Sequence, residues 1–313
     1  MMIMKKVFID GSAGTTGLRI HDRLNARGDL ALLTLSDDQR KDPKYRLEAM
    51  QQADVVFLCL PDAAAIEAEA LIDQTEAIVL DTSTAHRTAA GWCYGFPELS
   101  DARREEIIHS RRIAVPGCHA SGFIALVQPL VEAGILGEDA LLTCHSLTGY
   151  SGGGKSMIAD YTQAARSPLL DSPRQYALAQ QHKHLKEMRH IAGLKEFPVF
   201  CPIVADFYSG MEVTVPLFRS QLRSGAGPED IRAAYRNKYR GPILTYREKL
   251  EEGGFLAAGL LSGKDGMEVS VNGNEDRILL TAVYDNLGKG ASGAAIECMN
   301  LALGLDPAYG LAL

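Results

Sequence analysis

Cys118 is the residue of this sequence that is best placed for covalent chemistry. A short apolar run, residues 113–115, comes just before it, and apolar residues at helical spacing follow over 123–130, with Gly134 able to end the helix. We therefore expect Cys118 where a buried strand gives way to a helix N-terminus. The unpaired N–H groups and positive dipole end there favour thiolate over thiol, and the thiolate is the nucleophile. A small buried core cysteine is the competing interpretation.

Two histidines are candidates for the acid and base that such a thiol needs. His182 and His184 lie in a segment, residues 176–192, that the apolar pattern predicts to be helical. Side chains two apart on a helix point in different directions, so we expect only one of the pair to face the thiol. Glu187 would orient His184. Structural or solvated histidines are the alternative. His119 adjoins the thiol, but the geometry of a helix start is expected to turn it away.

A glycine-rich turn near the N-terminus predicts a dinucleotide site. An apolar run, residues 6–10, leads directly into Gly11-Ser12-Ala13-Gly14-Thr15-Thr16-Gly17, and a helical pattern follows. In such a unit the first glycine allows the tight turn, the second lets the backbone approach a pyrophosphate, and the third permits close helix packing. The spacing is GxxGxxG instead of GxGxxG, so a tight turn without a ligand is the alternative. The candidate cofactor-binding residues of this loop are Gly11, Ser12, Gly14, Thr15, Thr16 and Gly17.

The end of the second predicted strand, residues 31–35, is where the adenosine ribose of a dinucleotide is read. Ser36, with Arg40 and Lys41 nearby, would hold a 2′-phosphate, whereas Asp37 leaves NAD open. We therefore predict NADP(H) as the cofactor. A solvated charged loop is the alternative interpretation of this segment.

Two further predicted strands, residues 55–60 and 77–81, are joined by an alanine-rich helix. The alternation of strands and helices predicts an α/β fold, a Rossmann-type doubly wound parallel sheet with right-handed crossovers. Such sheets bind ligands beyond the carboxyl ends of their strands, and both Cys118 and the loop 82–87 follow a strand. Arg87 in that loop is our candidate for the substrate's α-carboxylate, because a guanidinium binds carboxylates with a planar fork. A structural ion pair is the alternative.

A second glycine-rich segment, residues 149–156, follows a predicted strand over 140–148 and matches the P-loop pattern GxxxxGK[ST]. A nucleotide-dependent phosphotransferase would use such a loop. Because the segment lies late in a chain that already has a dinucleotide fold, we instead predict that its N–H groups receive a phosphate of the substrate or the cofactor. Gly153, Gly154 and Lys155 are the candidate residues. A flexible surface loop is the remaining alternative.

The second half of the chain predicts a different architecture. Strand-like runs over 199–204, 211–218 and 278–284 indicate an α+β domain with a mixed or antiparallel sheet. Residues 285–288 should return the chain to the cofactor site, where Asn286 is a candidate contact for the nicotinamide amide. An ordinary turn asparagine is the alternative.

The first domain is therefore predicted to be discontinuous. A small-residue helix over 291–303 should pack back on it. We expect an NADP-binding domain of residues 1–116 plus 290–313, with a catalytic and substrate-binding domain of residues 117–289 inserted into it.

The totals of the 313-residue sequence restrict its class. The net charge of −7 argues against nucleic acid as the main partner, and no apolar run approaches the ~20 residues of a membrane span. Six cysteines lie without CxxC pairs, which indicates reduced thiols in a cytoplasm and neither a disulfide framework nor a zinc or other metal site. Residues 1–6 lead straight into a strand and lack the apolar region of a signal peptide.

Five segments, in order along nearly the whole chain, resemble one family. They are residues 11–17, 94–99, 115–118, 181–188 and 285–295. The fourth is similar to the family's HRHxPEI motif and the fifth to its C-terminal signature. Together they make the sequence resemble the N-acetyl-gamma-glutamyl-phosphate reductase family, the arginine-pathway member of the semialdehyde dehydrogenase group, and more closely its short form. Two departures fit the short form: Lys186 replaces the motif's proline, and His119 stands where long forms usually have tyrosine.

The resemblance implies NADPH-dependent reduction of N-acetyl-L-glutamyl 5-phosphate, a small-molecule acyl phosphate, to the 5-semialdehyde. Phosphate would be released through a Cys118 thioester. The resemblance also implies that His182 and His184 occupy the family's base position and that a glycine-rich loop borders the active site. The second domain would form the subunit interface of a homodimer or homotetramer.

Other functions stay open at this point. Aspartate-semialdehyde and glyceraldehyde-phosphate dehydrogenases use the same chemistry, but their cysteine contexts carry Asn or Thr neighbours that residues 116–118 lack. Outside enzymes, an NADP-sensing regulatory protein that has lost turnover is the alternative. A cysteine with a histidine pair argues against it.

Overall fold

The computed structural model describes residues 4–12, 14–223 and 225–313, and the chain divides into two compact units. The first unit is Met1–Pro116 with Ala291–Leu311, and the second is Gly117–Gly290 with Ala312–Leu313. Ala13 of the glycine loop lies outside the described residues, as do residues 1–3 of the segment that lacks the apolar region of a signal peptide.

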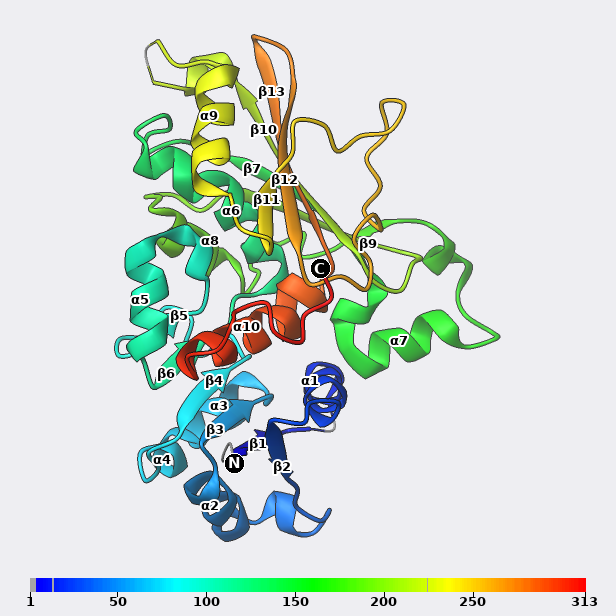
Figure 1. Ribbon diagram of the computed structural model, residues 1–313. Helices are drawn as coiled ribbons and strands as arrows, with labels where there is room; N and C mark the ends of the chain where they lie inside the picture. Colours follow the sequence, from blue (N-terminus) through cyan, green and yellow to red (C-terminus); the bar gives the residue numbers. More distant parts are fainter. Residues whose placement is uncertain (1–3, 13, 224) are drawn as a thin grey trace. The chain divides into compact units, whose positions relative to one another are not determined.

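The first unit contains a six-stranded sheet in which all neighbouring strands are parallel, in the order β2-β1-β3-β4-β6-β5 (Figure 1). This confirms the predicted doubly wound parallel sheet. The strands are β1 (Lys5–Asp10), β2 (Leu30–Leu33), β3 (Val55–Leu58), β4 (Ile78–Asp81), β5 (Cys93–Tyr94) and β6 (Arg112–Ala114). The helices are α1 (Thr15–Asn25), α2 (Pro43–Gln52), α3 (Asp62–Glu67), α4 (Glu69–Ile72), α5 (Asp101–His109) and α10 (Gly293–Ala302).

Helices cover both faces of this sheet because its strands are apolar on both. Val7 and Phe57 pack on one face with residues of α1, α5 and α10, whereas Phe8 and Val56 pack on the other with residues of α2 and α4. A parallel sheet buried on both faces requires such uninterrupted apolar strands. The core of the first face is completed by α10, which the chain supplies only after the whole second unit.

The second unit contains a seven-stranded mixed sheet in the order β11-β12-β13-β10-β7-β9-β8. The long strand β10 pairs antiparallel with β7 and β13, whereas β7 and β9 are parallel. This confirms the predicted mixed sheet. The strands are β7 (Thr143–Gly149), β8 (Arg174–Gln175), β9 (Val199–Ala205), β10 (Met211–Phe218), β11 (Leu244–Tyr246), β12 (Met267–Gly273) and β13 (Arg277–Tyr284). The helices are α6 (Cys118–Glu132), α7 (Gly154–Thr162), α8 (Leu185–Ala192) and α9 (Pro228–Lys238).

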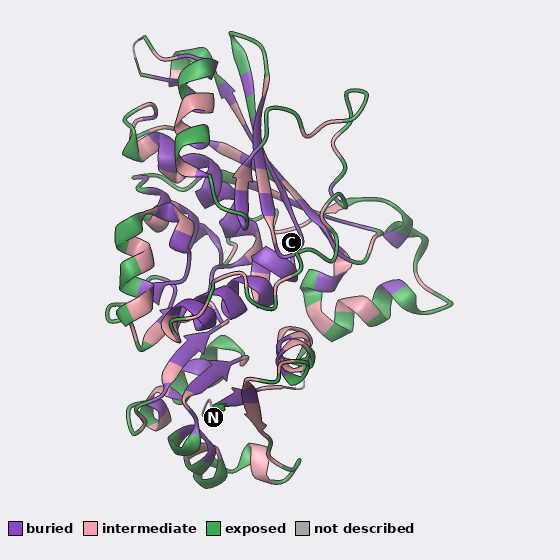
Figure 2. Cartoon of the chain, in the orientation of Figure 1, coloured by how far each residue is buried: buried purple, intermediate pink, exposed green. Residues whose placement is uncertain are grey.

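The two faces of the second sheet differ in burial. Along β10, every second residue from Met211 to Leu217 is buried, and the residues between them are half-buried (Figure 2). The buried face packs against α6, which contacts β10 and β13, and against α9, which contacts β12. A sheet with one packed face gives this alternation along its strands.

Helix α6 contains a proline. Two tyrosine hydroxyls stabilise the helix, one from within α9 and one from the residue that follows α9. Pro129 has no N–H to pair with the Ala125 carbonyl, and the Tyr239 hydroxyl donates to that oxygen instead, at 2.6 Å. Tyr235 donates to the next carbonyl, that of Leu126. The interior proline therefore leaves no orphaned carbonyl at Ala125.

Within residues 4–12, 14–223 and 225–313, every helix is too short or too polar to reach across a lipid bilayer.

Candidate active site

Cys118 is the first residue of α6, and β6 ends shortly before it at Ala114. Gly117 precedes the helix in extended backbone (φ −78°, ψ 145°) and has no side chain to cap it. The Cys118 side chain is partly exposed. The predicted junction of strand and helix is thus present, and the N–H groups of the first helical turn can receive an anion beside an accessible thiol.

Three imidazole rings gather near the start of α6. The ring centroids of His119 and His182 are 5.8 Å apart, those of His119 and His184 are 5.5 Å apart, and those of His182 and His184 are 4.8 Å apart. The expectation that His182 and His184 point in different directions is therefore wrong. His119 is buried within this cluster.

The pair converges because the predicted helix over 176–192 begins only at Leu185. Before it, Ala177 (φ 52°) and Gln180 (φ 55°) adopt left-handed conformations. The Tyr176 N–H donates to a carbonyl of β9, and the side-chain amide of Gln180 bonds the backbone of β9 as both donor and acceptor. These bonds to a strand replace helical ones, so the segment runs as a loop along the sheet. Apolar periodicity could not reveal that competition.

His119 is hydrogen-bonded through both ring nitrogens. Its Nδ1 lies 2.6 Å from Ser146 Oγ on β7, and its Nε2 lies 2.6 Å from the Tyr176 hydroxyl. Burial, followed by electrostatic repulsion from the titrating ring of His182 and from Lys183, lowers the pKa of His119 to about 3. The ring is therefore neutral near pH 7 and serves as a hydrogen-bonding link instead of an acid or base.

The sequence argument missed two members of this cluster. Ser146 had a usable signal, because it lies between Cys144 and Thr148 at alternate, buried positions of β7, where a polar side chain needs a partner. No local pattern in the sequence indicates Tyr176, because its contact with His119 spans 57 positions of the chain.

Glu187 connects α8 with the start of α6. This carboxylate is buried, its Oε1 lies 4.0 Å from His184 Nε2, and its Oε2 accepts a hydrogen bond from the Gly117 N–H at 3.1 Å. His182 has a different environment: its Nδ1 accepts from the His184 N–H at 3.2 Å, and burial with the charge of Lys183 lowers its pKa to about 4. Neutral His182 thus carries its proton on Nε2 and is a donor, whereas His184 lies beside the carboxylate of Glu187.

In the first unit, the backbone packs closely against Gly11 and Gly17 of the glycine loop, whereas Gly14 has free space beside it. Gly11 has φ 87°, and a Cβ there would lie 2.3 Å from the Cys59 carbonyl oxygen; one on Gly17 would lie 2.6 Å from the Gly11 oxygen. A Cβ on Gly14 would approach no atom closer than 3.7 Å. Helix α1 then begins at Thr15, whose buried Oγ1 has no hydrogen-bond partner among the described residues. An uncapped helix N-terminus with an orphaned hydroxyl suits a pyrophosphate.

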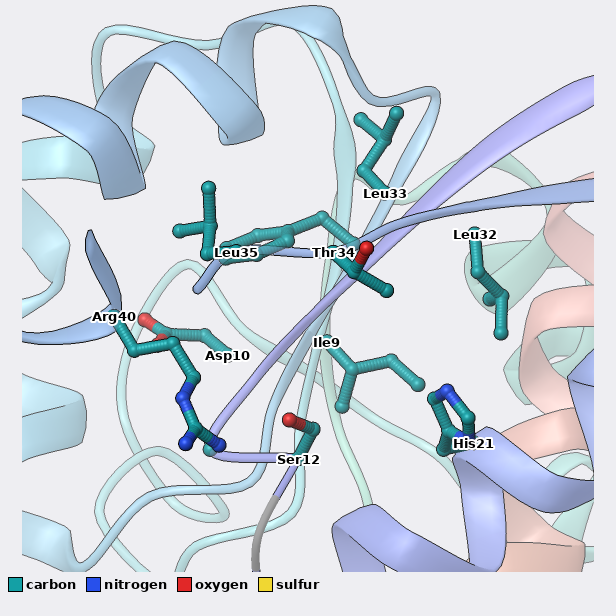
Figure 3. Close-up of a pocket in the computed structure, with 11 residues that line it drawn as sticks. Ile9, Asp10, Ser12, His21, Leu32, Leu33, Thr34, Leu35 and Arg40 are labelled. Carbon is teal, nitrogen blue, oxygen red and sulfur yellow. The ribbon is translucent and has the colours of Figure 1, made fainter. Parts of the chain in front are cut away.

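A cavity of about 120 Å³ opens at this loop, between the ends of β1 and β2 (Figure 3). Asp10, Ser12 and Arg40 lie at one end of it and His21 lies at the other. Asp10 is buried and forms an ion pair with Arg46 at 2.6 Å. The cavity therefore offers a serine hydroxyl and a guanidinium to a ligand at its polar end.

The segment predicted to read the ribose is a short turn. The Ser36 N–H donates to the Gln39 side chain at 3.1 Å, and the Gln39 N–H donates to Ser36 Oγ at 3.4 Å. Arg40 forms an ion pair with Asp37, and Lys41 is exposed. The acid that would favour NAD is thus paired with the cation that would favour NADP. A 2′-phosphate would compete with Asp37 for that guanidinium.

Arg87 is buried in the first unit and bonds to backbone carbonyls. Its Nε donates to the Val115 oxygen at 2.9 Å and its Nη2 donates to the Thr82 oxygen at 3.1 Å. These bonds join the segments that follow β4 and β6, so Arg87 has a structural role at the carboxyl edge of the sheet.

The loop over residues 149–156 differs from a P-loop. The N–H groups of residues 149, 150 and 151 donate to the carbonyls of 210, 207 and 208, so they are not available to a phosphate. The preceding strand β7 also lies between antiparallel β10 and parallel β9, not in a parallel sheet. Residues 152 and 153 and Lys155 are exposed, and Gly154, at φ 74°, begins α7.

Asn286 is buried and joins this loop to the segment before β10. Its Nδ2 donates to Ser151 Oγ at 3.0 Å, and its Oδ1 accepts from the Gly210 N–H at 3.0 Å. The side-chain amide therefore stabilises the loop that carries Lys155.

Although three imidazoles meet in the second unit, the part of the chain that the structure describes holds no group of three or more His, Cys, Asp or Glu side chains arranged to bind a metal ion.

Comparisons with known proteins agree on one group. The chain matches the family model for the semialdehyde dehydrogenase NAD binding domain over residues 12–107, and that for the semialdehyde dehydrogenase dimerisation domain over residues 118–286. It is 42% identical to N-acetyl-gamma-glutamyl-phosphate reductase 2 of Nostoc sp., over 98% of this chain and 99% of that protein. It is 43% identical to N-acetyl-gamma-glutamyl-phosphate reductase 2 of Pseudomonas putida, over 97% of this chain and 98% of that protein.

Solved structures share the fold at low identity. Aspartate semialdehyde dehydrogenase II of Vibrio cholerae matches with a TM-score of 0.71 and 16% identity, over 96% of this chain and 99% of that one. Aspartate semialdehyde dehydrogenase of Candida albicans, solved with NADP, matches with a TM-score of 0.67 and 15% identity, over 96% and 98%.

Proposed function

Because the chain belongs to the N-acetyl-gamma-glutamyl-phosphate reductase family of semialdehyde dehydrogenases, we propose that it reduces N-acetyl-L-glutamyl 5-phosphate to N-acetyl-L-glutamate 5-semialdehyde with NADPH, releasing phosphate, in arginine biosynthesis. The observation that carries the proposal is a partly exposed cysteine at the start of α6, with a buried glutamate bridging that helix start to His184. A thiol activated in this way forms acyl intermediates.

Cys118 is the proposed nucleophile. Its thiolate attacks the acyl carbon, and the developing oxyanion is stabilised by N–H groups of the first turn of α6. The bond from carbon to the phosphate oxygen then breaks, inorganic phosphate leaves, and a thioester to Cys118 remains. A thioester is electrophilic enough to accept a hydride. The corresponding ester to a serine is much less electrophilic.

The cofactor is NADP(H), and the first unit fits it. Gly11 and Gly17 allow the close turn, the open side of Gly14 leaves room for the pyrophosphate, and the orphaned hydroxyl of Thr15 gains a partner. We propose that Ser12 and Thr16 line the same loop, and that Ser36, Arg40 and Lys41 bind the 2′-phosphate, with Asp37 giving up its ion pair. When bound, NADPH supplies the hydride that reduces the thioester.

His184 is the proposed acid and base. It protonates the alkoxide that reduction of the thioester leaves, and it takes that proton back as the carbonyl forms and the bond from carbon to sulfur breaks, which returns Cys118 as thiolate. Glu187 stabilises the imidazolium that results. His182, whose Nδ1 already accepts a hydrogen bond, donates through Nε2 to the substrate oxygen.

The remaining candidates bind substrate or stabilise the site. We propose that Gly153, Gly154 and Lys155 receive the departing phosphate, a role that the exposure of Lys155 supports. Asn286 stabilises the loop over residues 149–156 through Ser151. A contact between Asn286 and the nicotinamide amide stays a prediction. Binding of the substrate carboxylate by Arg87 likewise stays a prediction. Two of its donors already bond backbone carbonyls, which favours the structural role.

The protein acts on small molecules and assembles through its second unit, which matches a dimerisation domain. We propose a homodimer, or a pair of dimers, formed through the less buried face of the mixed sheet. Large apolar side chains are exposed on three strands of that face: Val199, Phe218 and Leu279. The free thiols of all six cysteines suit the cytoplasm that we propose as its compartment.

The reverse reaction tests the function. Purified protein is mixed with N-acetyl-glutamate semialdehyde, NADP and phosphate, and NADPH absorbance is followed for the wild type, Cys118→Ala and Cys201→Ala. Phosphate-dependent NADPH formation that vanishes only in Cys118→Ala supports reaction, cofactor and nucleophile together. Turnover of aspartate semialdehyde alone would change the substrate, and activity that survives without Cys118 would exclude the thioester route.

A further inference from the structure

We propose that Tyr284 is a positioning residue for the nucleophile: its hydroxyl bridges the first turn of the helix that begins with Cys118 and so fixes how that cysteine is presented. The inference rests on the proposed function, in which Cys118 attacks the substrate. Tyr284 is the last residue of β13, a central strand of the mixed sheet (Figure 1).

The tyrosine hydroxyl contacts both ends of one helical turn. It donates to the Cys118 carbonyl oxygen at 2.6 Å and accepts from the Gly122 N–H at 3.1 Å. In a helix these two backbone groups are partners of each other, i to i+4. The phenol oxygen therefore lies beside the first such pair of α6 and sets the separation of the two groups.

Gly122 is what admits the tyrosine ring to this place. A Cβ on Gly122 would lie 2.7 Å from the Tyr284 hydroxyl oxygen and 2.7 Å from Cγ2 of Val213 on β10. Both distances are too short for any side chain. The close approach of helix and sheet at this turn is thus built into the sequence.

The chain beyond Tyr284 returns to the same cysteine. Asp285 accepts hydrogen bonds from the N–H groups of Leu287 and Gly288, which closes a tight turn. At its end, a Cβ on Gly290 would lie 3.0 Å from Cβ of Cys118. One strand end therefore holds the backbone of the cysteine through Tyr284 and borders its side chain through the turn that follows.

The chemistry of the phenol suits a permanent bridge. Burial, followed by the nearby charge of Cys118, raises the pKa of Tyr284 well above its ordinary value, so the hydroxyl stays protonated and can donate and accept at once. A fixed first turn keeps the N–H groups at the start of α6 in one arrangement around Cys118, and a helix N-terminus favours the thiolate.

The test compares two tyrosines on one helix. Tyr284→Phe removes the hydroxyl at Cys118 and keeps the ring. Tyr239→Phe makes the same change at the Ala125 carbonyl, in the second half of α6. Alkylation of Cys118 by iodoacetamide is followed by mass spectrometry of its peptide across a pH series, in the full chain, together with kcat, KM and the melting temperature.

We expect both variants to melt at lower temperature, because each removes a hydroxyl that donates to a carbonyl of α6. Only Tyr284→Phe should shift the alkylation midpoint to higher pH, by about half a unit to one unit, and lower kcat several-fold with KM nearly unchanged. An alkylation midpoint and kcat equal to those of the wild type would overturn the proposal, whatever the melting temperature.

A second variant covers the case in which Tyr284→Phe does not fold. Gly122→Ala keeps Tyr284 but displaces its hydroxyl, and it should shift the midpoint in the same direction; an unshifted midpoint in a folded Gly122→Ala protein also overturns the proposal. Alkylation needs no substrate. If the wild-type protein fails the reverse reaction while the variants still shift the alkylation midpoint, the proposed function is refuted and the role of Tyr284 stands.

Discussion

The glycine loop of the first unit and the thiol site of the second are built in opposite ways. The loop is made of consecutive residues, and its form depends on backbone conformation and close approach at Gly11 and Gly17. The thiol site draws side chains from α6, β7, β13 and the irregular segment before α8, for example Ser146 and Tyr176 around His119. A site made of backbone groups is encoded locally, whereas a site made of side chains is encoded across the fold.

This contrast predicts how each region fails. Changes in the thiol site should remove chemistry and leave cofactor binding intact, because its residues contact one another through side chains. Changes in the glycine loop should affect the fold and cofactor binding together, because the same backbone serves both.

The largest effect is expected from Cys118→Ser. A serine hydroxyl lacks the low pKa that makes the thiolate available, so kcat should fall at least about a thousandfold. NADPH affinity, measured by fluorescence titration, should stay within about twofold of the wild-type value. A variant that keeps a tenth of the activity would contradict the role of Cys118, and one that loses NADPH would break the contrast between the two regions.

The next largest effect is expected from substitutions that distinguish the roles of His182 and His184. His184→Asn should lower kcat by about two to three orders of magnitude, as expected for the loss of a general acid and base. His182→Asn can still donate a hydrogen bond and should lose about tenfold. Steady-state kinetics of the two variants decide the assignment. Equal losses, or a larger loss in His182→Asn, would reverse it.

The glycine loop itself can be divided into folding and binding positions. Gly11→Ala places a Cβ against the Cys59 carbonyl at a positive φ and should destabilise the protein by about 2–3 kcal/mol. Gly14→Ala meets no such contact, so its stability should change by less than about 0.5 kcal/mol while its KM for NADPH rises. Chemical denaturation with NADPH kinetics distinguishes them. Equal losses of stability would show that Gly14 also serves the fold.

The smallest effect, close to neutral pH, is a difference in pH dependence between the units. The pKa values of His119 and His182 in the second unit are lowered to about 3 and about 4 by burial and nearby positive charge. Their contribution to stability is present above the unfolded value near 6.5. It is lost as pH falls toward those values, because the unfolded chain then binds more protons. The rate is up to about 1.4 kcal/mol per pH unit for the buried His119 and less for the partly exposed His182, where solvent screens the charge.

His86 in the first unit should show the opposite sign. Burial alone would lower its pKa, but the hydrogen bond and charge of Asp81, at 2.6 Å, and the charge of Glu69, at 2.9 Å, raise it. Its contribution is therefore full below about pH 6.5 and is lost as pH rises through the raised value. Hydrogen exchange of peptides from each unit, in mild acid and mild base, measures both effects. The His86→Gln variant should remove the alkaline loss alone, and a loss that persists would contradict it.

The same contrast explains which parts of the structure the sequence could reveal. The parallel sheet and the glycine loop follow from apolar runs and from Gly11 and Gly17, whose requirements are local. The mixed sheet was also predictable, because alternation along residues 211–218 is set by one packed face. The start of α6 at Cys118 followed from helical spacing.

The errors arose where distant segments compete with local preference. The helix predicted over 176–192 is shortened by hydrogen bonds from Tyr176 and Gln180 to β9, which no local pattern records. For the same reason the shared cluster of His182 and His184 was missed. The P-loop pattern over 149–156 failed as a structural signal because the neighbouring residues 207–210 take up its first N–H groups.

The position of α10 in the chain has a consequence for biosynthesis. This helix completes one core of the first unit, yet the ribosome makes it only after residues 117–290 of the second unit. During translation the apolar sheet face around Val7 and Phe57 therefore stays only partly covered, by α1 and α5, while the catalytic half already has all its strands. The nucleotide-binding half matures last, and chains released before residue 293 are expected to be retained by chaperones or degraded.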